Sequence, residues 1–199
     1  MKYQTTTNFL KTFVSVFFLM TLNGNLNSNN QNSRETMLFD FGTLHNMADW
    51  LIVNDGVMGG LSESRFALSN RNTAVFSGYV TLENNGGFAS TRTKAMQFQM
   101  DGYKGILIRV KGDGKKYQFR LRTNNQFDGV AYRYHFETKK DQWQTISVAF
   151  NEFEPVFRGR TLQNVQPVSP QNIQQLGIMI SDKQTGNFKL EIQWIKKYQ

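Results

Sequence analysis

Few side chains in this 199-residue sequence could build a catalytic centre. Cysteine is absent, which removes disulfides, thiolate nucleophiles and zinc–thiolate sites together. Only His45 and His135 could serve a catalytic triad or a histidine metal site, and no G-x-S-x-G motif accompanies them. Carboxylates such as Asp55, Glu83 and Asp113 are scattered through turns, without a motif that pairs an acid with a base. We therefore expect a protein that is not an enzyme and that carries no cofactor.

A glycine-rich stretch, VNDGVMGGLSES at residues 53–64, has neither helical nor strand periodicity. It lacks the glycine–lysine spacing of a phosphate-binding loop. In the simpler interpretation, these glycines and those at 86 and 87 serve backbone geometry, with Met58 and Phe88 in the core. In the functional interpretation, three side chains of these loops and the strand that follows line a shared pocket: Asp55, Asn85 and Arg92. The first interpretation is favoured on general grounds.

A basic column is the second candidate site. Strand alternation places Arg120 and Arg122 on one face of a strand, and Arg133 and His135 on one face of a later strand. If the two strands pair, these side chains form a cationic surface that could meet an acidic partner surface or an anionic glycan. A solvated charged face is the simpler interpretation, because surface arginines normally need no partner.

Other basic features are weaker signals. In RGRT, residues 158–161, two guanidinium groups could clamp a carboxylate or phosphate, or could fasten the loop to Glu152 and Glu154, which we favour. The net charge of +8 permits attraction to acidic polysaccharide, anionic lipid or nucleic acid, and equally suits an ordinary basic domain. The basic segment 109–122 belongs to no recognised nucleic-acid-binding module, so we expect no nucleic-acid partner.

The elements that would position these residues are predicted to be strands. Apolar residues make up 39% of the sequence and aromatic residues 14%, which is enough for a core, and apolar and polar residues alternate in many short segments. The pattern predicts an all-β fold, a β-sandwich or jelly roll. Residues 105–123 are predicted to form a hairpin about the turn at 112–114, and residues 169–177 one short helical turn.

The amino-terminal segment differs in composition from the rest. An apolar run at residues 13–22 follows Lys2 and Lys11 and is too short to span a bilayer, so residues 1–24 are predicted to be a signal peptide for export to the periplasm or medium. A mitochondrial transit peptide is the alternative, because no acidic residue precedes Glu35. Residues 25–36 then form an Asn-rich linker and residues 37–199 a single sandwich domain without a transmembrane span.

The order of several motifs resembles the family of complex I intermediate-associated protein 30, whose domain is a galactose-binding-like jelly roll. The resemblance covers about residues 39–195, and its motifs are WLIVNDGVMGGLSES, FSGYVTLENNGGFASTRT, YKGILIRVKGDGKKYQFRLRT, FEPVFRGR and LGIMISDKQTGNFKLEIQWI. It implies a non-catalytic, chaperone-like assembly factor that holds partly built intermediates of respiratory complex I. An exported protein would not meet the mitochondrial matrix, so the fold transfers more readily than the role.

Two binding functions follow from these observations. The first is an exported module that binds a protein partner, and the alternative is a carbohydrate-binding module. A broad apolar patch would favour protein, whereas exposed aromatic rings along a sheet would favour sugar. The candidate rings are Tyr79, Tyr103, Tyr117 and Tyr198.

Overall fold

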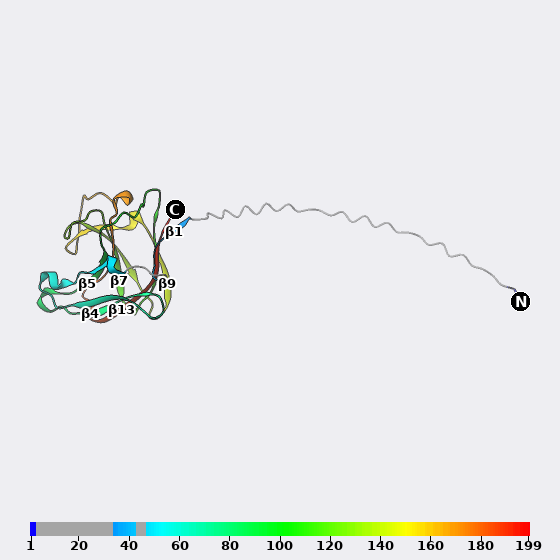
Figure 1. Ribbon diagram of the computed structural model, residues 1–199, viewed down its shortest axis with the longest axis horizontal. Coiled ribbons are helices and arrows are strands. Elements are labelled where there is room, and N and C mark those ends of the chain that lie inside the picture. The colour runs from blue at the N-terminus through cyan, green and yellow to red at the C-terminus, as the bar shows by residue number, and fades with distance from the viewer. Residues whose placement is uncertain (3–33, 43–46) are drawn as a thin grey trace. The chain divides into compact units, whose positions relative to one another are not determined.

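The computed structural model describes residues 1–2, 34–42 and 47–199. From residue 34 onward these residues form two packed antiparallel sheets, with β4 and β13 in one layer and β5 and β7 in the other (Figure 1). The prediction of an all-β sandwich is confirmed. Apart from residues 1–2, the predicted signal peptide lies outside the described residues, as does most of the predicted linker. The last two linker residues, Glu35 and Thr36, belong to a strand that pairs with the carboxyl-terminal strand.

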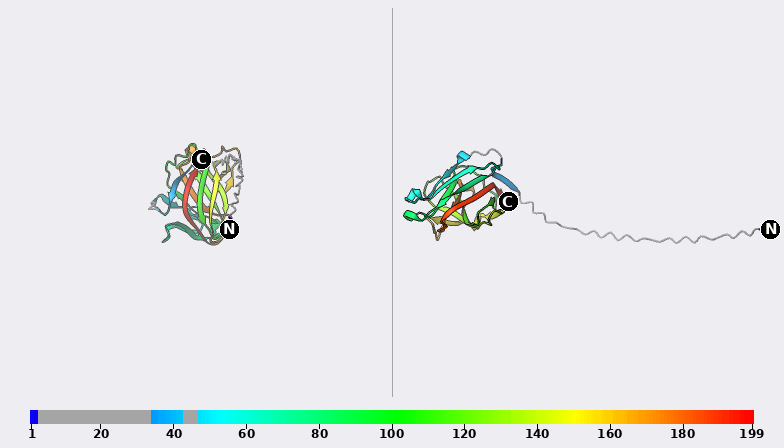
Figure 2. Two further views of the ribbon diagram at one scale, coloured as in Figure 1. Left: turned by 90° about the vertical axis from the view of Figure 1, so that its right-hand side faces the viewer. Right: turned by 90° about the horizontal axis from the view of Figure 1, so that it is seen from below.

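The first sheet, sheet A, has six strands, and β13 at its centre pairs along its length with β4, β1 and β6. Figure 2 (left) shows β13 in red between β1 in blue and β6 in green, with β9 in yellow beyond. The strands of sheet A are β1 (Glu35–Asp40), β3 (Glu63–Leu68), β4 (Ala74–Val80), β6 (Gly105–Lys111), β9 (Trp143–Ala149) and β13 (Gly186–Tyr198).

The second sheet, sheet B, has seven strands in the order β11-β10-β8-β7-β12-β5-β2. β7 is its central strand, with β8 on one side and β12, followed by β5, on the other. The strands are β2 (Trp50–Ile52), β5 (Ala89–Thr93), β7 (Lys116–Arg122), β8 (Ala131–Glu137), β10 (Glu154–Phe157), β11 (Arg160–Thr161) and β12 (Gln175–Ile180).

Helical structure among the described residues consists of short 3₁₀ helices. The one at Pro170–Asn172 lies where the sequence predicts a helical turn, directly after Ser169. No helix in the described part of the chain is long and apolar enough to cross a membrane. The 3₁₀ helices are η1 (Met47–Asp49), η2 (Asp55–Met58), η3 (Glu83–Asn85), η4 (Phe150–Glu152) and η5 (Pro170–Asn172).

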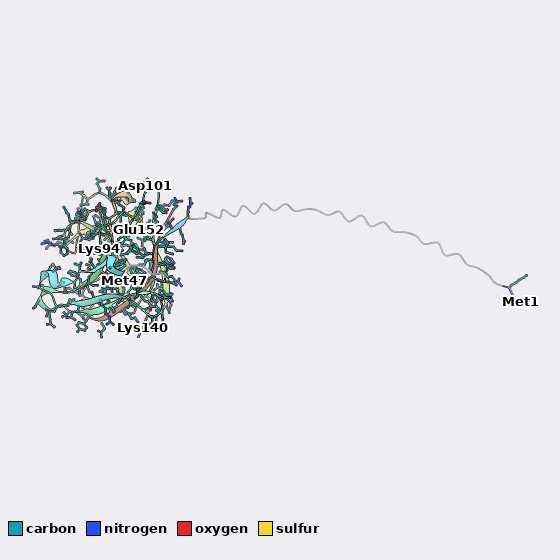
Figure 3. The ribbon with its side chains drawn as sticks, viewed as in Figure 1. Met1, Met47, Lys94, Asp101, Lys140 and Glu152 are labelled. Atoms are coloured by element: carbon teal, nitrogen blue, oxygen red, sulfur yellow. The ribbon has the colours of Figure 1, made fainter. Side chains whose placement is uncertain are left out.

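The core lies between the sheets, where the apolar side of each alternating strand is buried. Phe119 and Ile178 of sheet B and Phe76 and Ile192 of sheet A are fully buried. Side chains are drawn over both sheets in Figure 3, where Glu152 marks one end of the β6–β9 pair and Lys140 the other. Since one side of each sheet carries the core, polar residues on the other side of sheet B are free to form a surface site.

The hairpin predicted for residues 105–123 is wrong. β6 pairs with β9 and β13 in sheet A, whereas β7 pairs with β8 and β12 in sheet B, so the turn carries the chain from one sheet to the other. Asp113 fixes this crossing by accepting hydrogen bonds from the Tyr117 hydroxyl at 3.0 Å and from the Lys189 amide at 2.9 Å. The sequence pattern does not distinguish these cases. Two alternating strands joined by a Gly-Asp-Gly turn can pair as a hairpin, or can belong to opposite sheets and bury their apolar sides in the same core.

Candidate functional site

A cavity of about 920 Å³ lies on the side of sheet B that faces away from the core. Its floor is formed by β5, β12, β7 and β8. Its walls are formed by η2, by the segment that follows β4, and by residues 127–128, 158–159 and 181–183. Arginine dominates the charged residues that line it: Arg92, Arg120, Arg122, Arg133 and Arg158. We call this the sheet-B cavity.

A row of residues crosses the floor of the cavity from strand to strand. The register pairs Arg92 with Gly177, Gly177 with Arg120, and Arg120 with Arg133. Directly paired residues of neighbouring strands project to the same side of a sheet, so three guanidinium groups share this row. A Cβ atom on Gly177 would lie 3.0 Å from the Thr91 carbonyl oxygen and 3.2 Å from the Cβ of Arg92. An added side chain would therefore be crowded against β5. Gly177 lines the cavity without a side chain, so the gap between the Arg92 and Arg120 side chains reaches the backbone of β12.

Arg120 is the central guanidinium of this row, and its partners are neutral. Its Nη1 donates to the Gln118 Oε1 at 3.1 Å and contacts the Met179 sulfur at 2.9 Å. In the part of the chain that the structure describes, no carboxylate forms an ion pair with it. Burial lowers the pKa of Arg120 to about 10, with further contributions from the like charges of Arg122, Arg133 and Arg92. The group stays protonated at neutral pH, in surroundings that disfavour its charge.

The two neighbouring arginines are also held by uncharged groups. Arg92 donates to the Phe127 carbonyl oxygen at 3.1 Å, and Arg122 donates to the Gly129 carbonyl oxygen at 3.2 Å. Burial lowers the pKa of Arg92, and burial together with Arg92 lowers that of Arg122; the charge of Asp128 opposes both shifts. Within the described residues, the buried Nε of Arg92 and the buried Oε1 of Gln175 have no hydrogen-bond partner.

Ion pairs occur at the rim rather than on the central floor. Arg158 Nη2 lies 2.7 Å from the Asp128 carboxylate, and the Arg158 hydrogen bond is the main reason that the pKa of Asp128 is lowered. Arg133 Nε lies 3.6 Å from Glu154. The predicted fastening of Arg158 to Glu152 and Glu154 is wrong, because Arg158 binds Asp128, a residue 30 positions earlier that local spacing does not indicate.

The walls of the cavity carry exposed apolar side chains. Val57 and Met58 of η2 and Leu82 lie on one side, and the Arg92 guanidinium lies over the ring of Phe127, 4.9 Å from its centroid. Met58 is 58% exposed and Phe127 is 62% exposed. The expectation that Met58 fills the core is therefore wrong: the loop presents it to the cavity. One site could thus bind both an acidic group and an apolar side chain.

Asp55 does not line the cavity, so the predicted grouping with Asn85 and Arg92 is wrong for this residue. Asn85 and Arg92 do line the cavity. Asp55 is fully buried, and its carboxylate accepts hydrogen bonds from the Ser62 amide at 2.9 Å, the Gly87 amide at 2.7 Å and the Ser62 hydroxyl at 2.5 Å. It binds the two glycine-rich loops together and thereby positions the apolar wall.

Gly60 shows why glycine is needed in the first of these loops. A Cβ atom there would lie 2.4 Å from the Asp55 Cγ, closer than any real contact, so only a hydrogen fits beside the carboxylate. Burial alone would raise the pKa of Asp55, but hydrogen bonds from Ser62 and from the Gly87 and Phe88 amides outweigh it, and the pKa is lowered. The carboxylate is thus ionised and structural.

The basic column forms only in part. Because β7 and β8 pair, Arg120 lies opposite Arg133, and Gln118 lies opposite His135. The three arginines line the cavity, half-buried rather than fully solvated. His135 does not line it, and its Nδ1 lies 3.4 Å from the carboxylate of Asp182. The column therefore differs from the prediction at His135.

The predicted aromatic residues do not gather at the cavity, and the described residues form no cluster of metal ligands. Across residues 34–42 and 47–199, no three His, Asp or Glu side chains gather in a way that could hold a metal ion. The tyrosines proposed for sugar stacking lie elsewhere: Tyr117 is buried, Tyr79 is exposed on β4 of sheet A, and Tyr103 and Tyr198 do not line the cavity.

A family model for complex I intermediate-associated protein 30 matches residues 39–192. The chain belongs to this family. An uncharacterised protein of Schizosaccharomyces pombe is 29% identical, over 80% of this chain and 83% of its own length. The mitochondrial complex I intermediate-associated protein 30 of Mus musculus is 23% identical and that of Drosophila melanogaster 26%, each over 80% of this chain. The chain spans 55% of the mouse protein and 61% of the fly protein.

Solved structures place the fold of this family member among jelly-roll domains. A family 11 carbohydrate-binding module from Clostridium thermocellum, in complex with a mixed-linked tetrasaccharide, has a TM-score of 0.62 and 19% identity, over 82% of this chain and 94% of the module. An agarase has a TM-score of 0.54 and 10% identity, over 83% of this chain and 24% of the enzyme. At these identities the likeness shows the fold alone.

Proposed function

We propose that this chain is a non-catalytic binding protein that receives a protein partner in the sheet-B cavity. The observation that carries the proposal is the central floor of the cavity. There the hydrogen bonds that the described residues offer to Arg92, Arg120 and Arg122 come from neutral groups, beside exposed apolar walls. Such a surface has charge and apolar area to offer a partner. The scattered carboxylates and the structural role of Asp55 give it no acid–base pair for chemistry.

The first candidate partner is an assembly intermediate of respiratory complex I. The names of the mouse and fly relatives support this choice, and membership of the family supports a chaperone-like role for the domain. Both relatives extend well beyond the part matched by this chain, so the role is proposed for the shared domain.

A glycan is the second candidate, favoured by the fold of the carbohydrate-binding module. The lining of the cavity favours protein over a neutral sugar. Sugar rings bind by stacking on exposed aromatic planes, and in the cavity Phe127 already has the Arg92 guanidinium over its ring. A neutral glycan would also leave the arginine charges without a counter-charge.

The place where this binding occurs depends on the amino-terminal segment. The apolar run at residues 13–22 supports export, whereas the names of the relatives support the mitochondrial alternative. Sequencing the amino terminus of the mature protein from separated cell fractions distinguishes the two. Cleavage near residue 24 in an exported fraction would support export, and recovery from mitochondria would support the alternative.

The proposed function is tested by photo-crosslinking in cells with the full chain. A photoreactive amino acid replaces Met58 or Phe127 at the cavity, or Leu68 on β3 of sheet A as a control that is 44% exposed. We expect complex I subunits or assembly intermediates to be captured from the two cavity positions and not from Leu68. Equal capture at all three positions, or capture of polysaccharide alone, would refute the proposal.

A further inference from the structure

We propose that the gap over Gly177, between Arg92 and Arg120, is a carboxylate-binding subsite, and that its occupant is an acidic peptide segment with an apolar residue beside the acidic one. This inference rests on the proposed function and names the chemistry of the partner. The two flanking arginines come from β5 and β7, on either side of β12, so strand pairing sets the spacing of their Cα atoms about Gly177.

The charge of the floor calls for an anion. Arg120 has three arginines in its electrostatic surroundings, Arg92, Arg122 and Arg133, while its own hydrogen bonds go to an amide oxygen and a sulfur atom. Guanidinium groups present N–H donors in a planar fork that matches the two oxygens of a carboxylate. A carboxylate over Gly177 would have a guanidinium on each side and would supply the missing counter-charge.

A second observation indicates a ligand at the same place. Among residues 34–42 and 47–199, the buried Nε of Arg92 finds no acceptor and the buried Oε1 of Gln175 finds no donor. Buried polar atoms are nearly always hydrogen-bonded in native proteins, and exceptions often mark functional sites. Gln175 lies two residues from Gly177 on the same strand, about 6.6 Å away at the usual rise per residue, and on the same side of the sheet.

These two orphan atoms select among anions. A carboxylate oxygen can accept from the Arg92 Nε, but Gln175 Oε1 needs a donor, which an ionised carboxylate lacks and a backbone N–H of a bound peptide provides. The exposed side chains of Val57, Met58 and Phe127 then offer an apolar surface to a neighbouring residue of the peptide. A peptide with alternating acidic and apolar residues offers a carboxylate to the arginines, a backbone N–H to Gln175 and an apolar side chain to the wall.

The test measures binding of a fluorescein-labelled peptide of alternating Leu and Glu to the full chain by fluorescence polarisation. The matched peptide replaces every Glu with Gln. Because charge-assisted hydrogen bonds contribute more than neutral ones, we expect the Gln peptide to bind about 10-fold to 100-fold more weakly. Unlabelled oligoguluronate and inorganic phosphate serve as competitors that carry anions without a peptide backbone.

Variants locate the subsite. Arg120→Met keeps the aliphatic stem and should weaken binding of the Leu–Glu peptide about 10-fold or more, and Gly177→Ala should weaken it by filling the gap. Arg109→Met is the matched control, because Arg109 lies on β6 of sheet A and donates to Thr145 there. Thermal melts accompany each variant. If Gly177→Ala unfolds, Arg92→Met takes its place, with the same expected loss.

Each outcome decides the proposal. Equal binding of the Glu and Gln peptides, no binding of the Leu–Glu peptide at millimolar concentration, or a folded Arg120→Met that binds like the wild type would overturn it. Oligoguluronate binding more tightly than the peptide would replace the peptide by an acidic glycan. The crosslinking experiment tests the proposed function separately. If a protein is crosslinked at Phe127 but the peptide does not bind, the protein partner stands and the carboxylate subsite is rejected.

Discussion

Replacing Asp55 with Asn should strongly destabilise the sandwich although the two side chains have nearly the same shape. One carboxylate oxygen, Oδ2, accepts from Ser62 Oγ and from the Gly87 and Phe88 amides, and the other, Oδ1, accepts from the Ser62 amide. Asparagine can supply the first oxygen, but its NH₂ group then faces the Ser62 amide, donor against donor. The substitution therefore leaves one buried N–H without an acceptor and turns charge-assisted hydrogen bonds into neutral ones.

The cost of this change can be worked out from those contacts. An unsatisfied buried N–H costs about 1–3 kcal/mol, and each remaining bond loses up to about 1 kcal/mol without the charge. We expect the free energy of unfolding to fall by about 3–5 kcal/mol, measured by urea denaturation with the fluorescence of the buried Trp50 as the signal. Asp101→Asn, at an exposed turn, is the matched control and should change it by less than about 0.5 kcal/mol.

The pH dependence gives a second measurement of the same effect. The pKa of Asp55 is lowered in the folded protein, so its stabilisation is fully present above the ordinary carboxyl pKa and is lost as pH falls through the lower folded value. The difference in stability between wild type and Asp55→Asn should thus be constant near neutral pH and narrow below about pH 4. An Asp55→Asn protein as stable as wild type at pH 7 would refute this account of the two loops.

Two further predictions concern the centre of sheet B. Ile178→Ala should lower the free energy of unfolding by about 2–5 kcal/mol in the same urea assay, because Ile178 is fully buried on a central strand; a loss below 1 kcal/mol would contradict this packing. Arg120→Met should raise the free energy of unfolding by about 1 kcal/mol, since an apolar side chain replaces a half-buried cation that has no carboxylate partner. Thermal melts check it against Arg109→Met, and a lower melting temperature for Arg120→Met would show that the charge is compensated.

The fold could be predicted from sequence because it depends on local alternation. The second half of β7 shows this, because apolar and polar residues alternate there and burial follows, with Phe119 and Leu121 buried and Arg120 lining the cavity. The sheet to which a strand belongs is a property of distant pairing. Nothing local in residues 105–123 distinguishes a hairpin from a crossing between sheets, and the hairpin prediction failed there.

The sequence predicted which residues of each strand face the site, but not which strands come together to form it. Alternation found Arg120, Arg122 and Arg133, and the loop motifs found Asn85 and Arg92, but as two separate sites. They share one cavity because β12, from a third part of the chain, lies between β5 and β7. Gly177 and Gln175 were missed for this reason. An acidic residue in a glycine-rich loop suggested a ligand-binding role for Asp55. The structure instead shows a buried carboxylate that accepts from the Ser62 hydroxyl and from backbone amides.

The arrangement of charge in the cavity links stability to binding. A β-sheet fixes the spacing of the Cα atoms of Arg92 and Arg120, and hydrogen bonds to the Phe127 carbonyl oxygen and the Gln118 Oε1 hold the two guanidinium groups within the cavity. Their neutral partners orient them without neutralising them. An acidic ligand would thus meet donors that are already desolvated and oriented, and its binding would lose little free energy to reorganisation. The arginines that lower the free energy of unfolding of the domain are thus the same ones that would give it affinity for a carboxylate.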